Sequence, residues 1–174
     1  MASGIGSRIL GGWRNYFWIA AIAVSAVDQL TKLASARIGH EPIVLVPGFL
    51  DLVRPTLNPH GAFSLGPGRA LFYTLATLAG LALVGWFFVT SPAGRLRPHF
   101  ALGCVCGGAL GNLVDRVTLG AVRDFIDLHW MGRAHWPTFN VADAAICLGV
   151  GLLLLEALGP PGERGRQRGA ARAS

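Results

Sequence analysis

Four aspartates, Asp28, Asp115, Asp124 and Asp143, lie in or beside long apolar runs, and each has other polar residues beside it. A carboxylate at membrane depth is costly and is usually functional. Two carboxylates that meet in a partly desolvated cleft cannot easily both ionise, so such a pair shares one proton near neutral pH. The pair then supplies a general base that activates water and a general acid that protonates a leaving amide nitrogen. The residue types alone allow a second interpretation equally well, in which unrelated aspartates cap helices or bind interfacial water.

Asp124 and Asp143 are the candidates for this pair. Asp143 lies in the first turn of an apolar run, where the helix dipole favours an ionised carboxylate. Asn140 precedes it by three residues and shares its helix face. Asp124 lies nineteen positions before Asp143, just beyond another apolar run, so the chain can fold back and bring the two together. The spacing does not by itself choose Asp124 over Asp115 as the partner.

Further polar residues accompany the candidate pair. Asp28 and Lys32 have the i, i+4 spacing of a helical ion pair, which predicts a structural tether between helices or to an outer strand layer. Asn112, Asp115 and Arg116 place an amide, a carboxylate and a guanidinium within one helical turn. Arg116 can hold a substrate carbonyl, or it can pair with Asp115 and keep that residue ionised.

The elements that must position these residues are membrane helices. The chain has 174 residues, of which 52% are hydrophobic and 14% charged, and its mean hydropathy is +0.50. This composition is too apolar for an ordinary soluble domain, and the chain is too long for a single anchor. Four windows approach the length that spans a bilayer: residues 16–36, 70–90, 98–119 and 139–158. We predict an all-α membrane fold, with residues 1–174 as one integral-membrane domain.

Two further patterns refine this fold. Residues 43–46 and 49–53 are short β-prone runs divided by Pro47-Gly48, which predicts a small antiparallel strand layer at the outer membrane surface. Gly103, Gly107 and Gly111 recur every fourth residue, which predicts a helix stripe that a neighbouring backbone approaches closely.

The formal charge of +6 is distributed as in a membrane protein. Basic residues precede the first span, lie between the second and third, and fill the tail. With four spans these segments share one side, which the positive-inside rule assigns to the cytoplasm. Residues 1–15 and the basic tail, 159–174, are therefore predicted to be cytoplasmic, and the tail to bind acidic headgroups rather than nucleic acid. Arg8, Arg14, the apolar run and Ala34-Ser35-Ala36 also have the order of a secretory signal peptide, but Asp28 and Lys32 interrupt it, which favours an uncleaved helix.

Other reactive side chains are predicted to be structural. The three cysteines lie within predicted spans and are expected to pack there without disulfides or metal: Cys104, Cys106 and Cys147. His129 and His135 lie beside Trp130 and Trp136, which predicts an interfacial belt rather than a metal site. We therefore expect neither a metal nor an organic cofactor.

Five strings in register resemble the lipoprotein signal peptidase, or signal peptidase II, family of bacterial aspartic proteases. The strings are DQLTK (28–32), NPHGAFSL (58–65), GGALGNLVDR (107–116), VRDFIDLHW (122–130) and FNVADAAI (139–146). With the four spans, the resemblance covers nearly the whole chain except its termini. It implies four transmembrane helices with a small extracytoplasmic β cradle, and cytoplasmic termini. It also implies an activity, the removal of signal peptides from prolipoproteins by cleavage before a diacylglyceryl-modified cysteine. Members of this family are targets of the cyclic peptide globomycin.

The resemblance also implies roles for single residues. By motif match, Asp124 and Asp143 would be catalytic. Four residues would contact substrate or inhibitor, namely Asn58, Asn112, Arg116 and Asn140, and three would be structural, namely Asp28, Lys32 and Asp115. The string at residues 58–65 departs from the family pattern because His60 stands where Gly is common. The resemblance places the protein in the bacterial cytoplasmic membrane with its site near the extracytoplasmic face. We expect a monomer whose partners are the prolipoprotein and membrane lipids.

Two other functions fit parts of the pattern. A proton-coupled transporter or channel also needs charged residues in its spans. That function predicts carboxylates distributed through the bilayer depth, whereas three of these four lie near the outer ends of predicted helices. A noncatalytic binding relative would keep the helices and lose one of the two acids, and this chain keeps both.

Overall fold

The structure is a computed structural model that describes residues 12–59, 69–91 and 95–158. Four long helices are found in these ranges: α2 (Gly12–Ser35), α3 (Arg69–Thr90), α4 (Leu96–Leu119) and α5 (Val141–Leu158). All four are long and apolar enough to cross a membrane. The predicted four-helix membrane fold is therefore confirmed, with boundaries that differ from the prediction by a few residues.

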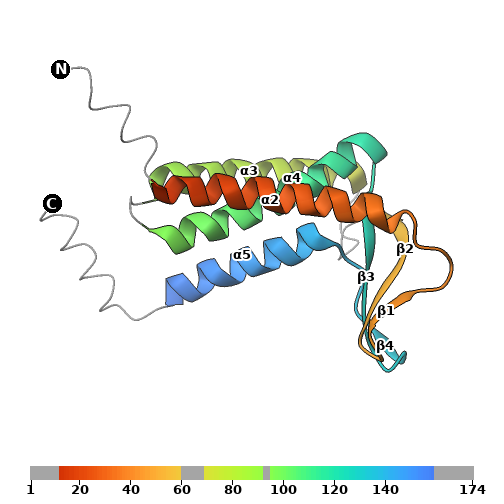
Figure 1. Cartoon of the computed structure of the whole chain (residues 1–174). Helices are drawn as coiled ribbons and strands as arrows, with labels where there is room; N and C mark the ends of the chain where they lie inside the picture. The colour runs from red at the N-terminus through yellow and green to blue at the C-terminus, as the bar shows by residue number, and fades with distance from the viewer. Residues whose placement is uncertain (1–11, 60–68, 92–94, 159–174) are drawn as a thin grey trace, which may run out of the picture.

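Helix α4 is the centre of the bundle, since it packs against α2, α3 and α5 (Figure 1). The glycines of α4 explain how closely the backbone of α2 approaches it. A methyl group on Gly103 would lie 2.5 Å from the carbonyl oxygen of Phe17, and one on Gly107 would lie 2.6 Å from that of Ala21. Gly111 faces the side chain of Asp28 in the same way. The predicted glycine stripe is thus the surface on which α2 packs.

A small antiparallel sheet lies across one end of the bundle, which we call the sheet end (Figure 1). In the described part of the chain its order is β1-β2-β3-β4. The strands are β1 (Ile43–Val46), β2 (Leu50–Asn58), β3 (Val122–Trp130) and β4 (Ala134–His135). The predicted hairpin of β1 and β2 is confirmed. Gly48 sits in its turn with a φ of 75°, a left-handed conformation that glycine adopts at no steric cost.

Strands β3 and β4 were not predicted, since residues 129–136 were expected to form an interfacial belt and no strand was assigned to residues 122–128. The residues of β3 do not alternate between apolar and polar, since its first six positions include buried Val122, Asp124 and Phe125. The strand forms because β2 offers a paired edge, with Asp51 opposite Asp127 and Thr56 opposite Asp124. Long-range pairing, rather than local pattern, decides this element.

The turn between α4 and β3 returns the chain over the sheet end. Gly120 ends α4 with a φ of 72°, and its N–H donates to the carbonyl oxygen of Arg116 at 3.1 Å. Left-handed glycines commonly end helices in this way. Because the turn is tight, β3 begins beside the last turns of α4, and the polar residues of the two elements meet.

Candidate active site

Asp124 lies near the start of β3 and is only 2% exposed. Its carboxylate accepts two amide hydrogen bonds, from Asn58 Nδ2 at 2.9 Å and from Asn140 Nδ2 at 2.7 Å. Burial raises the pKa of Asp124 from 3.8 to about 6, against these two hydrogen bonds, and the negative charge of nearby Asp143 raises it further. The side chain is therefore poised to exchange a proton near neutral pH.

Asp143 lies in the first turn of α5. Its carboxylate accepts a hydrogen bond from Asn112 Nδ2 at 2.7 Å and a longer one from the main-chain N–H of Asn140 at 3.4 Å. The main-chain N–H of Asp143 in turn donates to Asn140 Oδ1 at 3.0 Å. This reciprocal contact resembles a capping box, in which two residues satisfy each other's free N–H groups.

Asn140 thereby contacts both candidate acids, Asp124 through its side-chain amide and Asp143 through its main chain. Main-chain hydrogen bonds explain how the segments that carry Asp124 and Asp143 come together. Phe139 N–H donates to Ile126 O at 3.1 Å and Phe139 O accepts from Ile126 N–H at 2.9 Å, so the segment before α5 is fastened to β3. The fold-back predicted from the nineteen-residue spacing is confirmed in this sense.

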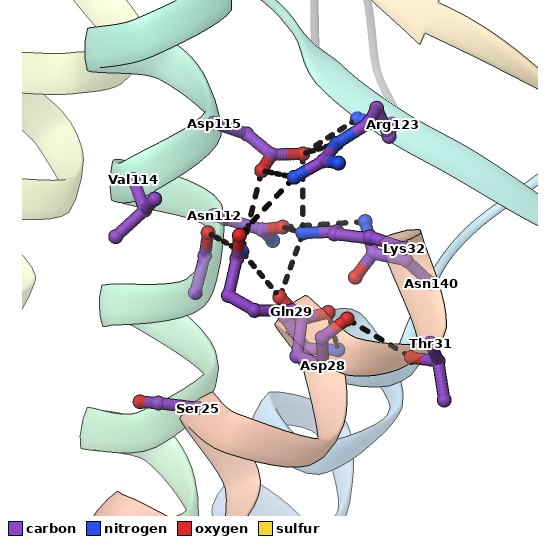
Figure 2. Close-up of polar contacts among 12 residues, drawn as sticks. Ser25, Asp28, Gln29, Thr31, Lys32, Asn112, Val114, Asp115, Arg123 and Asn140 are labelled. Atoms are coloured by element: carbon purple, nitrogen blue, oxygen red, sulfur yellow. Dashed lines mark hydrogen bonds and ion pairs between the residues drawn. The ribbon is translucent and has the colours of Figure 1, made fainter. Parts of the chain in front are cut away.

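Asn112 and Asn140 connect this pair to a cluster of charges, which we call the charged support: Asp28, Lys32, Asp115 and Arg123 (Figure 2). The first three are buried, and Arg123 is half-buried. The predicted ion pair is present, with Lys32 Nζ 2.8 Å from Asp28 Oδ2, and both side chains are fully buried. Lys32 also lies 3.4 Å from Asp115 Oδ2. Asp28 Oδ1 accepts from the main-chain N–H of Ala142 at 2.9 Å, so the predicted tether joins α2 to α5.

Lys32 determines the orientation of Asn112. The ammonium group has only donors, so Asn112 must present its oxygen to it, at 2.9 Å. The amide nitrogen of Asn112 therefore points the other way, toward Asp143. Asn140 Nδ2 reinforces this orientation with a contact to the same Asn112 oxygen at 3.2 Å.

Arg116 does not have the Asp115 contact that was one of its two predicted alternatives. Its Nη1 donates to Thr77 Oγ1 at 3.3 Å, and its guanidinium carbon lies 5.9 Å from the ring centroid of Tyr73. Asp115 is paired instead with Arg123, at 2.7 Å. The reason is geometric: Asp115 and Arg116 are adjacent on a helix and point in different directions, whereas β3 brings Arg123 onto Asp115.

Four polar residues of the site were missed in the sequence: Gln29, Tyr73, Thr77 and Arg123. Gln29 and Arg123 lie inside the DQLTK and VRDFIDLHW strings, so their position beside acids was the available signal. Tyr73 and Thr77 lie four residues apart on α3, a helix for which no polar role was expected.

The remaining candidates lie at the edges of the sheet or within the helices. Asn58 ends β2, while His60, where the chain departs from the family pattern, lies outside the described residues. His129 contacts Asp51 at 3.1 Å and His135 contacts Asp127 at 2.9 Å. No group of three His, Cys, Asp or Glu suited to a metal ion occurs in residues 12–59, 69–91 and 95–158. The three cysteines are free thiols, of which Cys104 is buried and Cys147 is exposed on the helix surface.

Known proteins are similar to this chain in sequence and in fold. Residues 20–159 match the family described as signal peptidase (SPase) II. A lipoprotein signal peptidase of Syntrophotalea carbinolica is 43% identical, over 84% of this chain and 92% of the relative. One of Polynucleobacter necessarius is 42% identical, over 77% of this chain and 83% of the relative. A solved structure described as a bacterial membrane enzyme superposes with a TM-score of 0.71 at 31% identity, covering 89% of each chain. With its four apolar helices, the chain thus belongs to the signal peptidase II family and is a multi-pass inner-membrane peptidase.

Proposed function

We propose that the protein is an aspartic endopeptidase in which Asp124 and Asp143 share one proton. Its substrate would be a prolipoprotein, cut immediately before a cysteine that carries a diacylglyceryl group. The observation that carries the proposal is Asn140, which contacts both carboxylates and so holds them at one place between β3 and α5. Neither acid is the partner of a cation in an ion pair of the described residues, unlike Asp28 and Asp115.

The charge balance of the described site supports a single shared proton. In the charged support, Asp28 and Asp115 balance Lys32 and Arg123. The two candidate acids face one further cation, Arg116, whose charge acts on both of them. If both acids were ionised, a buried site would carry one unbalanced negative charge, which a low-dielectric interior disfavours. One proton removes the imbalance.

In the proposed reaction, the shared proton lets one carboxyl act as an acid while the other acts as a base. The ionised carboxylate takes a proton from water while the water oxygen bonds to the scissile carbonyl carbon, and the protonated carboxyl donates to the carbonyl oxygen. As the C–N bond of the tetrahedral intermediate breaks, one carboxyl donates its proton to the leaving nitrogen and the other carboxylate takes a hydroxyl proton from the intermediate, so the pair again holds one proton. Asn112, Asn140 and Arg116 would orient the peptide, because the amides of Asn112 and Asn140 donate to the two acids and the charge of Arg116 acts on both.

The surroundings suit a substrate with acyl chains. Helix α3 exposes large apolar side chains along its length: Leu71, Phe72, Leu75 and Leu78. Its Tyr73 and Thr77 turn instead toward Arg116. Acyl chains could lie along this helix while the peptide reaches the polar site. We further propose that the chain works as a monomer among membrane lipids.

A transporter or channel is not favoured. The relatives are named as peptidases. The charged support and candidate acids lie in β3, in the last two turns of α2 and α4, and in the first turn of α5, rather than along the spans.

The proposal is tested with purified protein and a prolipoprotein in lipidated and unlipidated forms. We expect cleavage of the lipidated form, and loss of at least about a hundredfold in kcat for both Asp124→Asn and Asp143→Asn. Asp127→Asn, which changes an aspartate three positions along β3, is the matched control and should retain activity. Full activity in either dyad variant, or no cleavage by the native protein, would contradict the proposal.

A further inference from the structure

Arg123, the residue directly before Asp124, is attached to Asp115 by three N–H donors. Its main-chain N–H and its Nε lie 3.0 and 3.1 Å from Asp115 Oδ2, and its Nη2 lies 2.7 Å from Asp115 Oδ1. The side-chain contacts form the bidentate fork that guanidinium makes with a carboxylate. Both the backbone and the side chain of Arg123 are therefore held by one residue.

Asp115 is a firm anchor because it is fully buried and joins its own helix, α4, to α2. It belongs to α4, and it accepts from Gln29 Nε2 of α2 at 3.2 Å while lying 3.4 Å from Lys32 Nζ. Arg123 Nη2 also donates to Gln29 Oε1 at 3.1 Å. Figure 2 shows these side chains converging from α2, α4 and β3. The start of β3 is thus tied to the tightly packed pair of α2 and α4.

This attachment bears directly on Asp124. Successive residues of a strand point to opposite faces, so holding the backbone and side chain of residue 123 fixes the direction of residue 124. The side-chain partners of Asp124 are the neutral amides of Asn58 and Asn140. The two amides hold the carboxyl group itself, whereas Arg123 holds the backbone to which the Asp124 side chain is attached.

We propose that Arg123 is a positioning residue of the peptidase, which acts through Asp115 to aim the Asp124 carboxyl at Asn140 and Asp143. This inference depends on the proposed function. The Asp115 carboxylate also raises the pKa of Arg123, so the guanidinium keeps its charge at every pH at which the enzyme could be assayed. Arg123 therefore supplies geometry and a constant positive charge next to the candidate pair.

The two contributions predict different behaviour for two substitutions. Arg123→Gln removes the fork and the charge but leaves the main-chain N–H. Arg123→Lys keeps the charge and loses the planar fork. If Arg123 acts as proposed, Arg123→Gln should change both the rate of cleavage and its pH dependence, whereas Arg123→Lys should lower the rate and leave the pH dependence in place.

The experiment measures kcat, KM and the pH profile of cleavage of a lipidated prolipoprotein by the full chain. For Arg123→Gln we expect kcat to fall about ten- to a hundredfold, as for a misaligned catalytic group, with KM within about threefold. The basic limb of its pH profile should move to higher pH, because losing a nearby positive charge raises the pKa of an acid. Arg123→Lys should restore the pH profile and part of kcat. Arg54→Gln, which removes an exposed arginine from neighbouring β2, is the matched control and should resemble the native protein.

The outcomes separate this inference from the proposed function. If the native protein does not cleave, the proposed function fails and this inference with it. If the native protein cleaves and Arg123→Gln matches it in kcat and pH profile, only the positioning role is overturned. A loss confined to KM would also overturn it. Should Arg123→Gln not fold, Arg123→Lys decides: native kcat in that variant contradicts the proposal, and a reduced kcat with a native pH profile supports it.

Discussion

At the scale of single residues, Asp28 and Lys32 form a buried ion pair in which each charge compensates the other. Both side chains are fully buried, 2.8 Å apart. Removing one partner of a buried pair leaves an uncompensated charge, which typically costs about 3–5 kcal/mol. We therefore expect Lys32→Met to lower the unfolding free energy by roughly this amount, measured by denaturant unfolding in detergent.

A double-mutant cycle sharpens this prediction. Asp28→Asn keeps an oxygen for the Ala142 N–H but removes the charge. The double variant Asp28→Asn, Lys32→Met should be less destabilised than the sum of the two single changes, since it leaves one fewer unpaired charge. Arg97→Met, at an exposed position, is the control. Strict additivity of the two changes would show that the pair is not energetically coupled.

Asp124 links folding to pH. Burial raises its pKa from 3.8 to about 6, so the folded protein binds this proton more tightly than the unfolded chain. The contribution to stability is fully present below pH 3.8 and is lost as the pH rises through about 6. The difference corresponds to roughly 3 kcal/mol. Thermal unfolding in detergent should show Tm falling between pH 4.5 and 7.5.

Asp124→Asn tests the origin of that fall. The amide does not titrate, so this part of the pH dependence should disappear, whatever the absolute stability of the variant. Glu41→Gln removes an acid at an exposed position and should leave the dependence unchanged. Equal pH dependence in the native protein and Asp124→Asn would assign the effect to another group.

At the scale of elements, the glycines of α4 set the distance between helices. A methyl group on Gly107 would lie 2.6 Å from the carbonyl oxygen of Ala21 and 2.8 Å from Val24 Cβ, so α2 would have to shift. We expect Gly107→Ala to destabilise the bundle by about 1–3 kcal/mol, as overpacking does. Gly85→Ala on α3 meets nothing within 4 Å and is the matched control. Equal unfolding midpoints for the two variants would contradict close packing of α2 on α4.

Some of these elements could be predicted from the sequence and others could not. Helices α2 to α5 and the hairpin of β1 and β2 follow from local signals, namely apolar runs and a Pro-Gly turn. Strand β3 does not, because its acidic residues are accommodated by β2, Asn140 and the bundle rather than by local alternation. The partner of Asp115 was missed for the same reason. Arg116 is its neighbour in sequence, and only the return of β3 over α4 brings Arg123 closer.

At the scale of the whole molecule, charge asymmetry predicts the orientation in the membrane. The described starts of α2 and α4 and the end of α5 lie opposite the sheet end (Figure 1), and Arg14, Arg95 and Arg97 lie there. At the sheet end Arg123 is paired with Asp115, and at the opposite end Arg95 is paired with Glu156, which leaves Arg14 and Arg97 outside the ion pairs of the described residues. The positive-inside rule therefore predicts that the sheet end is extracytoplasmic.

Cysteine labelling in cells tests this orientation. Arg133→Cys lies at an exposed position between β3 and β4, and Gly12→Cys lies at the exposed start of α2, where a side chain meets nothing within 4 Å. A membrane-impermeant maleimide should label position 133 in intact cells and position 12 only after permeabilisation. The native chain, with Cys104, Cys106 and Cys147, measures the background. The reverse pattern would put the two acids on the cytoplasmic side, out of reach of a precursor cut after export. Because the acids lie at the sheet end, the side on which position 133 is labelled is also the side from which the proposed substrate would have to reach them.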